Sequence, residues 1–94
     1  MRYDLDLSDT ALDDLRRLPT PIRRYTVTQL EGLGEHPTLL SESARFPNEM
    51  EGQVCVFDYD FEQENWMMRI LFNYSEDERR LIIVRIRYLR QMIE

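Results

Sequence analysis

Residues 66–90 constrain the fold most strongly, because they predict two paired β-strands. Large apolar side chains occupy every second position from Trp66 to Tyr74, which is the period of a half-buried strand. The alternation returns at 81–88. The polar stretch 75–80 between them contains no glycine, which favours a loop of several residues over a two-residue turn. The second strand is expected to direct Ile82, Val84, Ile86 and Tyr88 to the core, and Ile83, Arg85 and Arg87 away from it.

A third strand is expected at 52–61, joined to Trp66 by a four-residue hairpin loop. That register places Asp58 directly opposite Arg69 and brings the arginines of the last strand beside them. Apolar side chains rimmed by charges are typical of a surface where a partner docks. The predicted partner-binding face comprises Val56, Asp58, Arg69, Leu71, Ile83, Arg85 and Arg87.

The N-terminal part predicts one strand and two helices. Residues 2–7 alternate as an edge strand, and Ser8 caps a helix that Pro19 ends. A second helix follows Thr20, and the segment 41–51 is expected to be a surface loop. The predicted fold is therefore α+β, in the order β-α-α-β-β-β, with a helical hairpin packed on one face of a mainly antiparallel four-stranded sheet.

Composition narrows the class of protein. A chain of 94 residues predicts a single domain, 1–94, and its one cysteine, Cys55, predicts a buried thiol in a reducing cytoplasm. The sequence contains no apolar run long enough for a signal peptide or a membrane span, so we expect a cytoplasmic protein without membrane contacts. No metal-ligand spacing or cofactor motif is present. The net charge of −6 argues against general affinity for nucleic acid, and all twelve basic residues are arginine, which leaves anion recognition to guanidinium groups.

Four local patterns accompany the predicted order of elements: YDLDLSDTALDDLRRLP, LEGLGEHP, MRILFNY and IIVRIRYLRQ. In their combination the chain resembles the RelE/ParE superfamily of toxins from bacterial toxin–antitoxin systems. The resemblance implies that the open face of the sheet is the working surface, that a cognate antitoxin masks it, and that the pair serves plasmid stabilisation. By position it assigns catalytic roles to Arg69 and Arg90. RelE-type enzymes, which are ribosome-dependent mRNA endonucleases, carry lysines where this chain has Val54, Val56 or Asp58.

Three functional hypotheses follow. The first is a toxin-fold component of a type II toxin–antitoxin pair that acts by binding, either as a ParE-like inhibitor of DNA gyrase or as a degenerate member. The second is an endoribonuclease that works with the ribosome and mRNA through Arg69 and Arg90, with Asp58 as the only base on that face. The third is a non-toxic interaction module or homodimer. A further alternative treats the arginines as a solvated face or as protection of a sheet edge, with Asp58–Arg69 an ordinary cross-strand ion pair.

Overall fold

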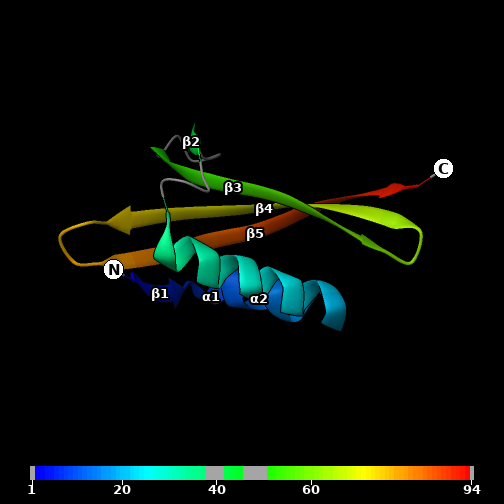
Figure 1. Cartoon of the computed structure of the whole chain (residues 1–94), viewed down its shortest axis with the longest axis horizontal. Helices are drawn as coiled ribbons and strands as arrows, with labels where there is room; N and C mark the ends of the chain where they lie inside the picture. Colours follow the sequence, from blue (N-terminus) through cyan, green and yellow to red (C-terminus); the bar gives the residue numbers. More distant parts are fainter. Residues whose placement is uncertain (1, 38–41, 46–50, 94) are drawn as a thin grey trace.

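Three long antiparallel strands form the centre of the molecule (Figure 1). They are β3 (Glu51–Phe61), β4 (Glu64–Ser75) and β5 (Arg80–Met92). The computed structural model describes residues 2–37, 42–45 and 51–93; for 42–45 and 51 only the backbone is described. Short strands flank the centre: β1 (Asp4–Leu7) pairs parallel with β5, and β2 (Glu42–Arg45) pairs antiparallel with β3.

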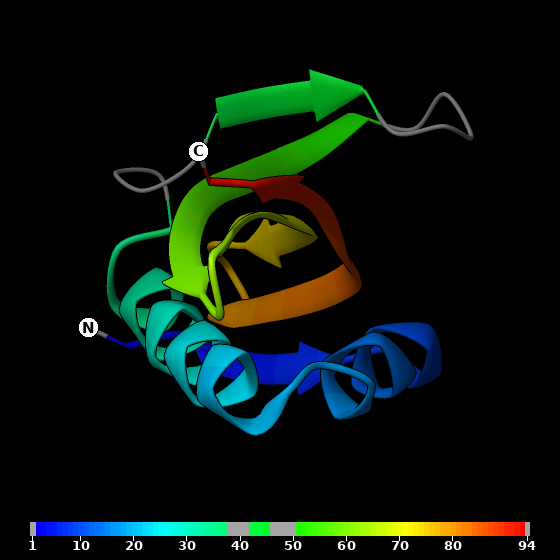
Figure 2. The same ribbon diagram turned by 90° about the vertical axis from the view of Figure 1, so that its right-hand side faces the viewer.

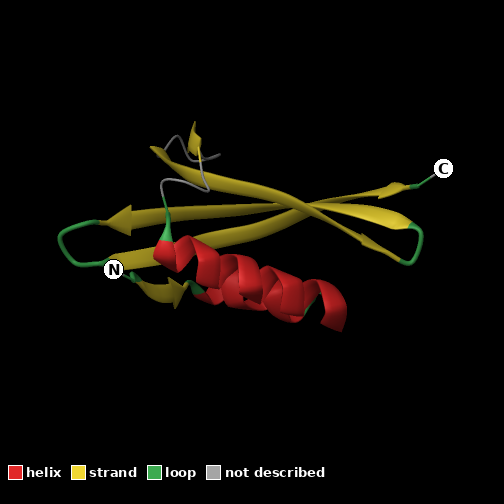
Figure 3. Ribbon diagram, viewed as in Figure 1, coloured by secondary structure: helices red, strands yellow, loops and turns green. Residues whose placement is uncertain are grey.

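The sheet has five strands in the order β1-β5-β4-β3-β2 (Figure 3). The predicted α+β fold class and the order of its strands and helices are confirmed. Strand β2 is an addition, since it lies in a segment that we expected to be a surface loop.

Both helices, α1 (Asp9–Arg16) and α2 (Thr20–Glu35), pack on the same side of the sheet (Figure 2). Pro19, with φ −54°, precedes the first turn of α2. Ile22 and Leu33 of α2 are fully buried against the sheet, whose inner face contributes the largest buried side chains. These are Met68, Ile70, Phe72, Leu81 and Ile83.

The turn between β3 and β4 is tighter than the sequence predicted. It consists of Glu62 and Gln63 alone, both with positive φ (50° and 65°), and Phe61 pairs with Glu64 instead of Trp66. Positive φ at both central residues characterises the two-residue hairpin turn whose twist matches that of the strands. The predicted register is therefore wrong by two residues. Such a shift changes every cross-strand partner but keeps each side chain on its predicted face.

A β-bulge in β5 reverses two further orientations. Phe72 pairs with Ile83 and Leu71 with Arg85, so Val84 is an extra residue on β5. Before the bulge Ile83 faces the core and is fully buried, whereas Ile82 is exposed. The predicted orientations of Ile82 and Ile83 are therefore wrong, and Ile83 belongs to the core.

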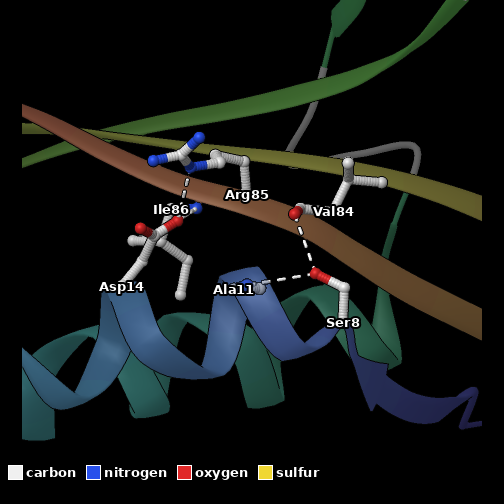
Figure 4. Close-up of polar contacts among 6 residues, drawn as sticks. All are labelled: Ser8, Ala11, Asp14, Val84, Arg85 and Ile86. Carbon is white, nitrogen blue, oxygen red and sulfur yellow. Dashed lines mark hydrogen bonds and ion pairs between the residues drawn. The ribbon is translucent and has the colours of Figure 1, made fainter.

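Helix α1 covers the outer edge of β5 where β1 ends (Figure 4). The Ser8 hydroxyl accepts a hydrogen bond from the Ala11 amide (3.0 Å), as an N-cap does, and donates one to the Val84 carbonyl (2.9 Å). The Asp14 carboxylate accepts from the Ile86 amide (3.0 Å). Two side chains thus replace the hydrogen bonds that a longer β1 would supply.

Candidate functional site

Side chains of β3, β4 and β5 that point away from the helices form a regular grid, which we call the open face. The strand register sets four rows, each with one residue per strand. The rows are Val54–Leu71–Arg85, Val56–Arg69–Arg87, Asp58–Met67–Leu89 and Asp60–Asn65–Gln91.

Apolar side chains on the open face are unusually accessible. Val56, Met67 and Leu89 expose 55, 41 and 57 % of their surface. Val56 lies beside Arg69 in the same row, and Met67 and Leu89 lie in the next row. Met67 and Leu89 were not part of the predicted partner-binding face, although both share the parity of Arg69 and Arg87. Apolar groups of this size clustered around charges are typical of a protein-binding surface.

Arg69 and Arg87 lie directly opposite each other across β4 and β5. Among the described residues, neither guanidinium group forms an ion pair or a hydrogen bond. Like charges that face each other across a ladder are destabilising. The described part of the fold therefore places two positive charges opposite each other without a counter-charge, which favours binding of an anionic group.

Asp58 does not supply that counter-charge. It lies opposite Met67, one row away from Arg69, and its carboxylate accepts a hydrogen bond from the side-chain amide of Asn65 (3.1 Å). The same amide donates to Asp60 (2.8 Å). The predicted Asp58–Arg69 cross-strand pair is therefore not formed, although both residues occupy the face on which they were expected.

Arg85 also lies on the open face, yet its charge is neutralised. Its Nε donates to Asp14 Oδ2 (2.9 Å), and only 11 % of the Asp14 side chain is exposed (Figure 4). The same carboxylate oxygen binds the Ile86 amide. Arg85 therefore connects α1 to the sheet through an ion pair. Of the arginines on the predicted partner-binding face, Arg69 and Arg87 have no ion pair with a described residue.

Arg90 lies on the opposite side of the sheet. It pairs in the ladder with Trp66, and its guanidinium lies 4.7 Å from the centroid of that indole ring, which also packs against Tyr88. Two hydrogen bonds join it to Glu64, at 3.0 and 2.6 Å. These hydrogen bonds hold the pKa of the Glu64 carboxyl below its ordinary value.

The three residues predicted as catalytic are thus not assembled in one place. Arg69 and Asp58 share the open face without touching, and Arg90 is paired on the other face. Within the described residues no group of three or more His, Cys, Asp or Glu side chains could hold a metal ion. Neither described helix has the length and apolar character that crossing a membrane requires.

The predicted burial of Cys55 is confirmed. Only 4 % of its surface is exposed, and burial raises the pKa of the thiol. A buried thiol with a raised pKa is a poor nucleophile, so Cys55 is part of the core and not of a reactive site.

Comparison with known proteins identifies the fold. Neither a family model nor a curated protein sequence matches this chain. Among the solved structures, a chain of the RelBE2 toxin–antitoxin complex from Mycobacterium tuberculosis is similar, with 20 % identity and a TM-score of 0.69 over 95 % of this chain and 100 % of that one.

Two Escherichia coli structures are also similar. A double arginine-to-alanine mutant of the toxin RelE in the free state has 15 % identity and a TM-score of 0.65, covering 92 % of this chain and 82 % of that one. The intact RelBE toxin–antitoxin complex has 15 % identity and a TM-score of 0.61, covering 89 % and 93 %. The chain thus has the RelE toxin fold, which confirms the resemblance to the RelE/ParE superfamily at the level of the fold.

Proposed function

We propose that this chain, with its RelE toxin fold, is the toxin component of a type II toxin–antitoxin pair and acts in the cytoplasm by binding protein through its open face. The observation that carries the proposal is the opposed pair Arg69 and Arg87, unpaired among the described residues and surrounded by exposed apolar side chains. Two of the similar solved structures are toxin–antitoxin complexes, which supports a cognate antitoxin as the partner.

The composition of the open face favours a protein partner over nucleic acid. Asp58 and Asp60 lie within two rows of Arg69, and the whole chain carries a net charge of −6. Both features oppose a long polyanion, because nonspecific binding to nucleic acid comes from neutralising many phosphates. An amphipathic protein segment with one or two carboxylates meets the two arginines and also covers Val56, Met67 and Leu89.

Induced expression tests the proposal. We expect the wild-type chain to arrest growth, and co-expression of a small protein encoded by the adjacent reading frame to restore it. The double variant Arg69→Gln/Arg87→Gln should lose both the arrest and binding to that small protein while remaining folded. Arg16→Gln, a change of charge on α1, should behave as wild type. Unaffected growth on expression of the wild-type chain alone would rule out a toxin.

The effect on DNA gyrase distinguishes a ParE-like inhibitor from a degenerate member of the superfamily. Under the ParE-like hypothesis the purified chain inhibits DNA supercoiling by gyrase, and the double variant does not. Inhibition of supercoiling to the same extent by both proteins would contradict a role for the arginine pair. A degenerate member binds the antitoxin and leaves gyrase active.

A second candidate function is ribosome-dependent cleavage of mRNA, which the adjacent guanidinium groups of Arg69 and Arg87 favour because arginine binds phosphate through paired hydrogen bonds. Arginine is a poor general base, because its guanidinium group stays protonated at neutral pH. Asp58 would have to supply the base while hydrogen-bonded to Asn65. Mapping of mRNA ends at the ribosomal A site distinguishes the candidates: cleavage that Arg69→Ala abolishes favours the nuclease, and unchanged mRNA favours binding.

A further inference from the structure

Among the described residues, only those along the first half of β5 have hydrogen-bonding partners at the outer edge of this strand. Strand β1 pairs with residues 80–83. From there to Ile86, the side chains of Ser8 and Asp14 form the hydrogen bonds to this edge. Beyond Ile86, no hydrogen bond from any other described residue reaches this edge. Figure 1 shows the C-terminal end of β5 extending past the ends of both helices. The stretch 87–93 is called the free edge below.

The backbone groups at the free edge can be identified from its neighbours. The Ile86 amide points outward to Asp14, whereas the Ile93 amide points inward to the Gln63 carbonyl. Because the direction alternates along a strand, Tyr88, Arg90 and Met92 present their N–H and C=O groups outward. This row of free donors and acceptors has the spacing that another strand needs for pairing.

The side chains of the free edge do little to block such pairing. Met92 and Ile93 expose 74 and 46 % of their surface, beside the already exposed Leu89. Charged side chains usually protect an edge, but Arg87 is the one charge here without an ion pair among the described residues, because the guanidinium of Arg90 lies over the Trp66 ring and is hydrogen-bonded to Glu64. The edge therefore combines open hydrogen-bonding groups with apolar contacts on both faces of the strand.

We infer that the free edge binds an extended acidic segment of a partner protein, which adds to the sheet as a further strand next to β5. Residues 87–93 contain two arginines and no acid, and Arg87 has no ion pair among the described residues, which favours a carboxylate on the incoming strand. A second copy of β5 fits poorly, because antiparallel pairing centred on Arg90 would set the two Arg90 residues directly opposite each other. The inference does not depend on toxicity, because it rests on the backbone groups of β5 and is tested with a peptide on the purified chain.

Amide hydrogen exchange measured by NMR tests this inference on the whole chain. Without a partner, the amides of Tyr88, Arg90 and Met92 should exchange fast, and those of Leu89 and Gln91, which bond to β4, should exchange slowly. The probe is a synthetic eight-residue peptide of alternating glutamate and valine. It should slow the three outward amides by about tenfold or more at saturation, since strand addition gives each a backbone acceptor.

Two control peptides define the recognition. A peptide of alternating lysine and valine should not protect the outward amides, and neither should the glutamate–valine peptide with N-methyl groups on every second amide. Equal protection by the acidic and basic peptides would overturn the charge argument. No protection by the acidic peptide would overturn the inference itself. Protection that appears without peptide as the protein concentration rises would assign the edge to a second copy and overturn the choice of partner.

A matched pair of variants localises the binding. Met92→Pro removes an outward N–H and leaves the bonds to β4, so it should weaken binding of the acidic peptide by about tenfold, whereas Met92→Ala should change it by less than about threefold. Slow exchange of Leu89 and Gln91 in both variants verifies that β5 remains paired. Equal affinity of the two variants would place the peptide elsewhere.

Discussion

Replacing Arg87 with glutamine should stabilise the protein, although the change removes a charged residue from the proposed binding surface. Arg87 faces Arg69 across the ladder, and neither has a counter-charge among the described residues. Glutamine keeps most of the aliphatic contact and removes the repulsion. The expected result is a small gain in the free energy of unfolding together with a loss of partner binding.

The size of the gain follows from the separation of the two charges. Guanidinium groups that splay apart from opposed positions sit about 7 Å from each other, and in a water-like dielectric their repulsion is about 0.6 kcal/mol. Screening reduces it to about 0.2 kcal/mol at about 0.15 M salt and leaves about 0.5 kcal/mol at about 0.01 M. For a domain of this size the low-salt gain raises Tm by about 2–4 °C.

Urea unfolding measured through the fluorescence of Trp66 provides the assay, because this residue is the only tryptophan in the chain and is 4 % exposed. Arg16→Gln is the control, since it makes the same change in net charge at a site whose ion pair with Asp13 is exposed and long (4.0 Å). The gain from Arg87→Gln should be largest at low salt, and the control should show none.

A double-mutant cycle supplies the refuting result. If the gain comes from the Arg69–Arg87 repulsion, Arg87→Gln should stabilise the wild type and have no effect in a chain that already carries Arg69→Gln. An equal gain in both backgrounds would mean that the two arginines do not interact. A loss of stability at both salt concentrations would mean that Arg87 has a favourable partner, and the proposed anionic site would then lose its physical basis.

Three further predictions concern other parts of the fold. Ser8→Ala should cost about 1–2 kcal/mol in urea unfolding, because it removes both the helix cap and the bond to β5, and Ser8→Thr should recover most of it. The folded state lowers the pKa of Glu64, so near that pKa the unfolded state binds more protons than the folded state. Wild type should therefore be more stable than Glu64→Gln at neutral pH, and this difference should disappear as the pH falls through the pKa of the folded state. Urea unfolding of both proteins across that pH range measures the difference. The Cys55 thiol is buried and has a raised pKa, so it should react with a thiol reagent only as fast as the core opens. Reaction in native buffer at the rate of a free thiol would contradict the packing.

The sequence predicted the order and type of the main elements because alternation along β3, β4 and β5 is strong, Ser8 caps α1, and prolines mark the boundary between the two helices. It did not predict the register, because the β3–β4 turn uses Glu62 and Gln63 where positive φ usually selects glycine or asparagine. It also did not predict the bulge, since Ile82, Ile83 and Val84 are equally apolar and only the pairing with β4 shows which one is extra.

The candidate site was predicted in part for the same reasons. A register shift of two residues leaves faces unchanged, so Arg69 and Arg87 appear on the open face as expected, while Asp58 moves one row away from Arg69. The pairing of Arg85 with Asp14 joins residues 71 positions apart, and no local pattern reports such a contact. The free edge of β5 likewise depends on where β1 stops, which is a property of the assembled sheet.

The parallel pairing of β1 with β5 joins the first and last strands that the structure describes. On the ribosome, β1 and both helices emerge while the strand that completes the sheet is still unmade, so the apolar side of α2, with Ile22 and Leu33, lacks the central strands that it packs against in the folded chain. Closing a loop that spans most of the chain costs entropy that the neighbouring hairpins do not incur. The hairpins of β3, β4 and β5 should therefore form first, with β1 and the helices docking onto them only after translation has passed residue 83.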